Sequence, residues 1–205
     1  MTKTIYFDCE TGSLPDEQLA IVKPEFTAPK NYKKPEAISE YLVQAETDWR
    51  ERAALSAITG RVLAIGLLTG DDFQVIEGTE LGILTGFWAA WEHNQDARFV
   101  GWFVKGFDLP FLFRRSLALS VPVPKDLNEG RYFNSRIVDL AEIWCCGNRE
   151  QKESLDIVAK SLGIGAKNGD GKDFAVLWAS DKEKAKEYLH NDLRLTAGIA
   201  KRMGF

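Results

Sequence analysis

The order of short apolar runs and helical repeats constrains the fold of this chain more than any other feature of its sequence. The strand-like runs lie at residues 3–8, 62–68, 71–78, 97–102 and just before Asp139. Helical spacing is found at residues 79–93, 107–119, 154–164 and 181–203. Strands come early and are mixed with helices, and helices dominate the end. The pattern therefore predicts an α/β fold with a mixed central β-sheet flanked by helices.

A long connection, from about Ser13 to Thr59, separates the first two expected strands and far exceeds the usual few residues. Its first half, residues 19–37, is rich in Pro and Lys, and we expect it to be irregular. Its second half has apolar residues at helical spacing, which predicts an amphipathic helix packed on the body. We expect one domain over residues 1–205, with an insertion at about 13–59 that is either structural or a lid over the substrate.

The composition limits the class of protein. The 205 residues include no apolar run of about eighteen and no basic-then-apolar leader, so we expect a soluble protein without a membrane partner. Three cysteines without a paired CxxC motif favour the cytoplasm. A net charge of -4 argues against a broadly basic nucleic-acid binder. It does not exclude a nuclease, because carboxylates that hold metal ions also count as negative.

Two acids, Asp8 and Glu10, follow the first apolar run. Side chains alternate along a strand, so the two share a face, with their Cα atoms about 6.6 Å apart. A divalent cation such as magnesium or manganese would turn their repulsion into attraction. Taken alone, the pair is better explained as a solvated strand end.

Two further aspartates stand where helices are expected to begin. Asp108 precedes Pro110 in a first helical turn, so its side chain is expected to cap that helix if it is considered alone. Asp139 lies at a similar change from strand to helix, and we predict a structural capping role for it.

Asp192 is harder to explain as a surface residue, because it lies within the apolar face of the last expected helix. A buried carboxylate needs an arginine, a set of hydrogen-bond donors or a metal ion. Tyr188 lies one turn earlier on the same face, so both groups can point into one site. The alternative for Tyr188 is an ordinary core aromatic residue.

Three segments in order, "FDCET", "VGWFVKGFDLPFLFRR" and "YLHNDLRLTAGI", resemble the exonuclease motifs of the DEDD 3′→5′ exonucleases. Asp8, Glu10, Asp108 and Asp192 match the four acids, and Tyr188 matches the tyrosine of the DEDDy branch. The chain is similar to the proofreading exonuclease domain of family B DNA polymerases, and we expect it to stand alone, without an attached polymerase. The resemblance implies a ribonuclease H-like fold.

The resemblance also implies a mechanism and a substrate. Two divalent ions, Mg²⁺ or Mn²⁺, would be held by the four acids, and Tyr188 would orient the attacking water. The expected substrate is the 3′ end of single-stranded DNA, with RNA as an alternative and a catalytically silent nucleic-acid-binding module as a third possibility. The residues expected to contact substrate are Thr11, Gly12, Trp102, Phe103 and Phe107.

One position departs from the family pattern, since Phe103 stands where related second motifs commonly have asparagine. This change affects a polar contact near the terminal nucleotide and leaves the metal ligands in place. Several cations are candidates for phosphate contacts, although a solvated charged face is the default for such runs. They are Lys30, Lys33, Lys34, Arg114 and Arg115.

Overall fold

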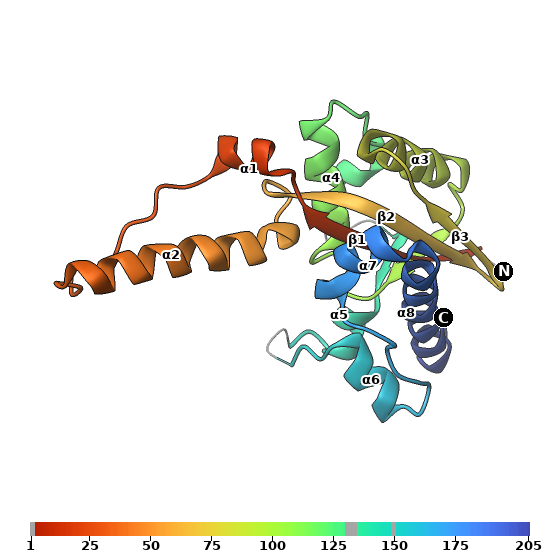
Figure 1. Ribbon diagram of the computed structural model, residues 1–205. Coiled ribbons are helices and arrows are strands. Elements are labelled where there is room, and N and C mark those ends of the chain that lie inside the picture. The colour runs from red at the N-terminus through yellow and green to blue at the C-terminus, as the bar shows by residue number, and fades with distance from the viewer. Residues whose placement is uncertain (1–2, 130–134, 149–150) are drawn as a thin grey trace. The chain divides into compact units, whose positions relative to one another are not determined.

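The computed structural model describes residues 3–129, 135–148 and 151–205 (Figure 1). It divides into two compact units. One comprises residues 1–10 and 62–205, which we call the sheet unit, and the other comprises residues 11–61, which we call the insertion unit.

Five strands form a single sheet in the order β3-β2-β1-β4-β5. They are β1 (Thr4–Ser13), β2 (Gly60–Thr69), β3 (Asp72–Ile76), β4 (Arg98–Gly101) and β5 (Ile137–Asp139). β4 pairs in parallel with β1 and with β5, whereas β2 and β3 form an antiparallel hairpin. The mixed sheet confirms the prediction from sequence. Of the stretch before Asp139, residues 130–134 lie outside the described residues.

Helices cover both faces of the sheet in the sheet unit. α3 and α4 lie on one side, and α5 to α8 lie on the other (Figure 1). Their bounds are α3 (Glu80–His93), α4 (Asp108–Ala118), α5 (Leu140–Trp144), α6 (Leu155–Ser161), α7 (Phe174–Ser180) and α8 (Lys182–Arg202), with 3-10 turns at Lys125–Glu129 and Gly171–Asp173. None of the helices in the described ranges is both long and apolar enough to cross a membrane.

The pleat of β1 decides which side of the sheet receives its acids. Phe7 packs toward α3, where its ring centroid is 5.5 Å from that of Phe87. Tyr6 points the opposite way and contacts the core built from α6 and α8. Asp8 and Glu10 share the face of Tyr6, so β1 delivers both carboxylates to the α8 side. β1 also extends past the expected strand, which places the two acids inside it rather than at its end.

Gly101 allows the end of β4 to lie close to β1. A Cβ atom at this position would lie 2.2 Å from the Val104 Cγ1 atom and 2.8 Å from the Phe7 carbonyl oxygen. Any larger residue would therefore displace the turn that follows β4. That turn leads directly into α4 and its first residue, Asp108.

The insertion unit contains α1 (Asp16–Val22), α2 (Pro35–Glu51) and a 3-10 turn at Ala53–Leu55. α2 is the predicted amphipathic helix, and residues 23–34 are irregular as expected, whereas α1 was not predicted. α2 buries none of its residues. The packing of α2 on the body, and the choice between a structural insertion and a lid, stay predictions.

Candidate active site

Three carboxylates from two distant parts of the sequence meet in the sheet unit. One oxygen each of Asp8, Glu10 and Asp192 lies within 4.8 Å of the others. β1 supplies the first two residues and α8 supplies the third. Hard divalent cations prefer clustered carboxylate oxygens of this kind, so the three acids can contribute ligands to one metal site.

Asp108 lines the same pocket, but its carboxylate has a different partner. The Cys9 backbone N–H donates to Asp108 Oδ1 at 2.9 Å. The N-cap of α4 is Phe107, and no side chain makes a capping hydrogen bond there. The interpretation of Asp108 as a helix cap is therefore wrong, because its side chain joins the start of α4 to the β1 residue between Asp8 and Glu10.

Tyr188 and Asp192 both face inward from α8, and each is 3% exposed. The Tyr188 hydroxyl and Asp192 Oδ1 are buried, and neither has a hydrogen-bond partner among the described residues. Burial, followed by the charges of Glu10 and Asp192, raises the pKa of Tyr188, so its hydroxyl stays protonated. Buried oxygens rarely lack partners, so this arrangement fits a site that is completed by an oxygen-binding cation.

The protein environment makes the charged form of each acid costly. Burial and the neighbouring Asp192 raise the pKa of Asp8 to about 7, although Lys167 opposes the shift. Burial is also the main reason that the pKa values of Glu10, Asp108 and Asp192 lie above their ordinary values. A divalent cation would favour the ionised carboxylates and reverse this penalty.

A pocket of about 380 Å³ opens over the acids. Trp102, Phe103 and Phe107, which were predicted to contact substrate, are among the residues that line it. All three are partly exposed, so their rings are not simply core residues. Their contact with a nucleotide stays a prediction.

Asp139 supports the turn that carries these aromatic residues. Phe103 has φ 63°, a left-handed conformation that is unusual for a bulky residue. Asp139 accepts hydrogen bonds from the backbone N–H groups of Phe103 at 3.0 Å and Lys105 at 2.9 Å. It also caps α5 by accepting from the N–H groups of Ala141 and Glu142. The predicted cap is confirmed, but sequence reasoning missed the bonds to the turn.

Two lysines that sequence reasoning missed also line the pocket. Lys167 Nζ lies 2.5 Å from Asp192 Oδ2, and Lys152 Nζ lies 3.3 Å from the Phe103 ring centroid. The need of a buried Asp192 for a positive partner was predictable. Its identity was not, because Lys167 lies in an irregular segment with no periodicity or motif.

One of the proposed phosphate-binding cations has another role. Arg115 is buried, and its Nε and Nη2 atoms each donate to a carboxylate oxygen of Glu80 at 2.8 Å. It therefore joins α4 to α3 instead of lying on a charged surface. Arg114 is exposed.

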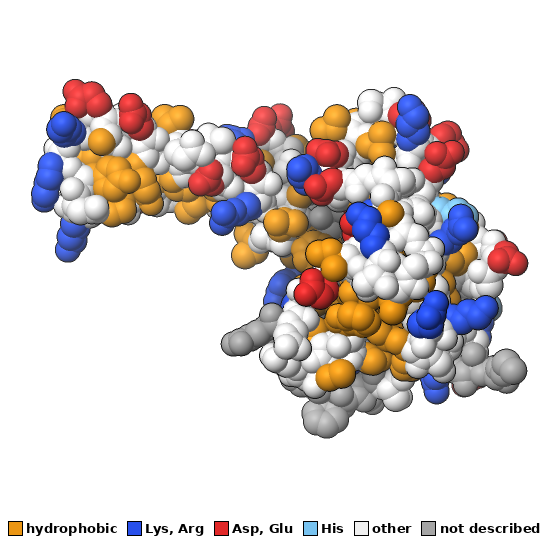
Figure 2. Space-filling view, turned by 90° about the horizontal axis from the view of Figure 1, so that it is seen from below, with side chains coloured by type: hydrophobic (Ala, Val, Ile, Leu, Met, Phe, Trp, Pro, Cys, Tyr) orange, Lys and Arg blue, Asp and Glu red, His pale blue; other side chains and the backbone are white. Residues whose placement is uncertain are grey.

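Positive charge is dispersed over one face of the protein. On the face in Figure 2, Lys and Arg side chains are interspersed with Asp and Glu and do not form one broad basic area. This agrees with the net charge of -4. Attraction of a polyanion to this protein would depend on local groups rather than on the overall charge.

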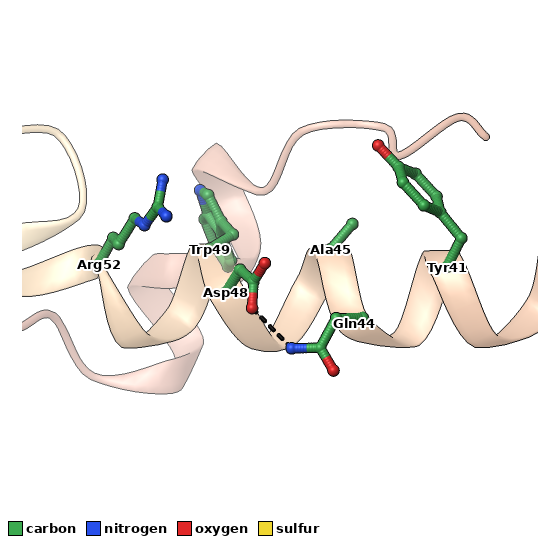
Figure 3. Close-up of a pocket in the computed structure, with 6 residues that line it drawn as sticks. All are labelled: Tyr41, Gln44, Ala45, Asp48, Trp49 and Arg52. Atoms are coloured by element: carbon green, nitrogen blue, oxygen red, sulfur yellow. Dashed lines mark hydrogen bonds between the residues drawn. The ribbon is translucent and has the colours of Figure 1, made fainter. Parts of the chain in front are cut away.

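The insertion unit has a hollow of its own, of about 360 Å³, along one side of α2 (Figure 3). Tyr41, Ala45 and Trp49 project from this side. Thr11 and Gly12 also belong to the insertion unit, in which the Thr11 hydroxyl donates to the Ala54 carbonyl oxygen at 2.8 Å. Substrate contacts by Thr11 and Gly12 stay predictions.

Comparison with known proteins identifies the family. Residues 52–196 match a family described as a predicted 3′-5′ exonuclease related to the exonuclease domain of PolB. The family B DNA polymerase from the hyperthermophilic archaeon Pyrobaculum calidifontis has a similar structure, with a TM-score of 0.67 and 19% identity over 99% of this chain. The chain corresponds to 24% of that polymerase chain. A search of curated proteins found no match.

The structural match confirms the predicted ribonuclease H-like fold. The family match covers most of the chain and includes Asp108, Tyr188 and Asp192, while Asp8 and Glu10 precede it. The chain therefore belongs to the family of predicted 3′-5′ exonucleases related to the exonuclease domain of PolB.

Proposed function

We propose that the protein is a divalent-metal-dependent 3′→5′ exonuclease that releases nucleotides from the ends of single-stranded DNA. The observation that carries this proposal is the cluster of Asp8, Glu10 and Asp192 oxygens within 4.8 Å, next to the buried Tyr188. Membership of the exonuclease family supports the same reaction class.

Four carboxylates would hold two divalent ions, Mg²⁺ or Mn²⁺. Asp8 would contribute to holding both ions, Glu10 and Asp192 would help to hold the ion that activates water, and Asp108 would help to hold the ion that stabilises the leaving group. When bound, the ions would offset the carboxylate charge, make water nucleophilic and stabilise the leaving 3′ oxygen. The fit is supported by buried carboxylates whose pKa values are raised in the absence of a cation.

Tyr188 has a positioning role at the attacking water in this proposal. Its raised pKa keeps the hydroxyl protonated, so it can donate or accept a hydrogen bond but is a poor general base. The hydroxyl is buried without a partner among the described residues, which leaves it available to a water. Asp192, one turn later on α8, lies on the same side of the site.

The choice of a single strand follows from the aromatic residues around the pocket. Unpaired bases stack on exposed aromatic rings, and Trp102, Phe103 and Phe107 supply such rings. We also assign the protein to the cytoplasm, because Cys9, Cys145 and Cys146 are all free.

Substrate polarity and polymer type are tested with oligonucleotides labelled at the 5′ end. The proposal predicts that single-stranded DNA is shortened one nucleotide at a time, and that an inverted 3′ linkage blocks the reaction. A matched RNA strand should be cut more slowly. Faster cutting of RNA would replace the DNA assignment by an exoribonuclease, and shortening from the 5′ end would contradict the proposed polarity.

A further inference from the structure

We propose that Lys152 is a substrate-binding residue, whose Nζ donates hydrogen bonds to a backbone phosphate of the bound strand, and that Phe103 positions it. The proposal rests on the proposed exonuclease function and names a cation through which the pocket would hold an anionic strand. Lys152 lies outside the three sequence motifs, and Phe103 is the position at which the chain departs from the family pattern.

The ammonium group of Lys152 lies on a face of the Phe103 ring. Nζ is 3.3 Å from the ring centroid, which places it over the ring rather than beside its edge. The contact is a cation–π interaction, in which the negative face of the ring attracts the positive charge. An ammonium group has three N–H donors, and the ring contacts it from one side only. The remaining donors are therefore free for an anionic partner.

The direction of the Phe103 ring is built into the turn that follows β4. Asp139 accepts from the Phe103 N–H, and the Phe103 carbonyl oxygen accepts from the N–H groups of Gly106 at 2.9 Å and Phe107 at 3.0 Å. Gly106 also makes room for the ring, because a Cβ atom there would lie 2.0 Å from Phe103 Cε2. These contacts hold Phe103 in its left-handed conformation, and such strained residues cluster at functional sites.

The charge of Lys152 is available to a strand in the pocket. Lys152 and Phe103 both line the pocket over the acids, and the acids repel a phosphate. Lys167, the other lysine in the lining, already pairs with Asp192. Within residues 3–129, 135–148 and 151–205, no carboxylate forms an ion pair with Lys152. Because hydrogen bonds between charged groups are the strong ones, a phosphate beside Lys152 would gain a substantial contact.

A lysine that only packs on the ring makes a different prediction. In that case the loss of its charge would leave DNA affinity and the salt dependence of binding unchanged. If Lys152 contacts a phosphate, its loss weakens binding and removes one counterion from the salt dependence. If Phe103 acts through Lys152, losing both side chains weakens binding no more than losing the lysine alone.

The test compares wild type with Lys152→Met, Phe103→Leu, the double variant and the control Lys182→Met. Lys182 also lies over an aromatic ring, with Nζ 5.0 Å from the Trp178 ring centroid, but it is not among the described residues that line the pocket. The dissociation constant for 5′-labelled single-stranded DNA is measured in chelator at several salt concentrations. KM and kcat are measured with Mg²⁺, and Tm is measured for each variant.

We expect Lys152→Met to raise Kd about tenfold, the value of one hydrogen bond to a charged group. The slope of log Kd against log salt should fall by about 0.7, the contribution of one phosphate contact on a single strand. KM should rise more than kcat falls. Phe103→Leu should raise Kd about threefold, the double variant should match Lys152→Met, and Lys182→Met should match wild type. Lys152 is exposed, so Lys152→Met should keep the wild-type Tm and decides the phosphate contact even if Phe103→Leu unfolds.

Three results would overturn the assignment. A Lys152→Met variant with the Kd and salt slope of wild type would show that Lys152 contacts no phosphate. An equal loss in Lys182→Met would show that the effect is one of overall charge. Losses that add in the double variant would show that Phe103 binds the strand independently of Lys152. A wild type that binds the strand but does not shorten it refutes the exonuclease function, whereas the Kd values still decide the role of Lys152.

Discussion

Without bound cations, the acid site should destabilise the protein as the pH rises. Burial and the nearby Asp192 raise the pKa of Asp8 from 3.8 to about 7. The folded chain then binds a proton that the unfolded chain has already lost, so stability falls as pH rises between these two values. A shift of about 3 units corresponds to about 4 kcal/mol. For a chain of this length that lowers Tm by roughly 8 to 16 °C.

Other groups modify this pH dependence without changing its sign. Burial raises the pKa values of Glu10 and Asp108, so both act in the same direction as Asp8. Burial and the charge of Arg194 lower the pKa of His190. This group therefore makes stability rise with pH until the pH reaches the ordinary pKa of histidine, which is opposite to the effect of the acids. His190 is a single group at the surface of α8, so the buried acids should dominate.

Thermal unfolding in a chelator from pH 5 to pH 8 measures the effect. Wild type should lose Tm steadily, and Mg²⁺ or Mn²⁺ should restore it at pH 8. Asp8→Asn should be more stable than wild type at pH 8, by a clearly larger margin than at pH 5. The control Glu187→Gln, at an exposed position on α8, should keep the wild-type dependence. A wild-type Tm that is constant or rises over this range would show that the acid site does not destabilise the cation-free protein.

Two further substitutions test individual contacts. Tyr188→Phe removes only the hydroxyl and should slow cleavage about tenfold, which is the value of one hydrogen bond. Calorimetry should find the Mn²⁺ affinity unchanged. A loss of Mn²⁺ affinity would contradict the positioning role of Tyr188. Asp139→Asn turns an amide donor toward one of its backbone N–H partners, so unfolding should show a loss of about 1–3 kcal/mol together with slower cleavage. The control is Thr79, the N-cap of α3, whose side-chain oxygen accepts a hydrogen bond from the Gly82 N–H. Thr79→Ala should cost about 1 kcal/mol and leave the rate unchanged. An Asp139→Asn variant as active as wild type would show that the turn does not affect cleavage.

The sequence predicted those parts of the fold that depend on local patterns. Periodicity located the strands and the longer helices, because their apolar faces repeat over several turns. α1 and α7 were missed. Each spans seven residues, a length at which periodicity does not decide the structure, although α6 of the same length was located. β1 continues past its apolar run to Ser13, an extension that a local hydrophobic pattern does not report.

Local patterns also predicted part of the candidate site. The position of Asp192 on an apolar helix face indicated a need for a partner, and the order of the acids pointed to a family. The contacts of Asp108 with Cys9 and of Asp139 with Phe103 join residues 99 and 36 positions apart, so capping was the natural interpretation from sequence. Lys167 depends on the path of an irregular segment, which no local pattern specifies.

In the proposed function, Asp192 and its neighbouring acids hold the divalent cations that drive cleavage at a 3′ end. The most direct measurement follows 5′-labelled single-stranded DNA with wild type, Asp192→Asn and Glu187→Gln, in Mg²⁺ or Mn²⁺ and in chelator. Wild type and Glu187→Gln should give a ladder of 3′-shortened products, with none in chelator, and the rate of Asp192→Asn should be at least about 100-fold lower. No shortening by wild type with either cation, or full activity in Asp192→Asn, would contradict it.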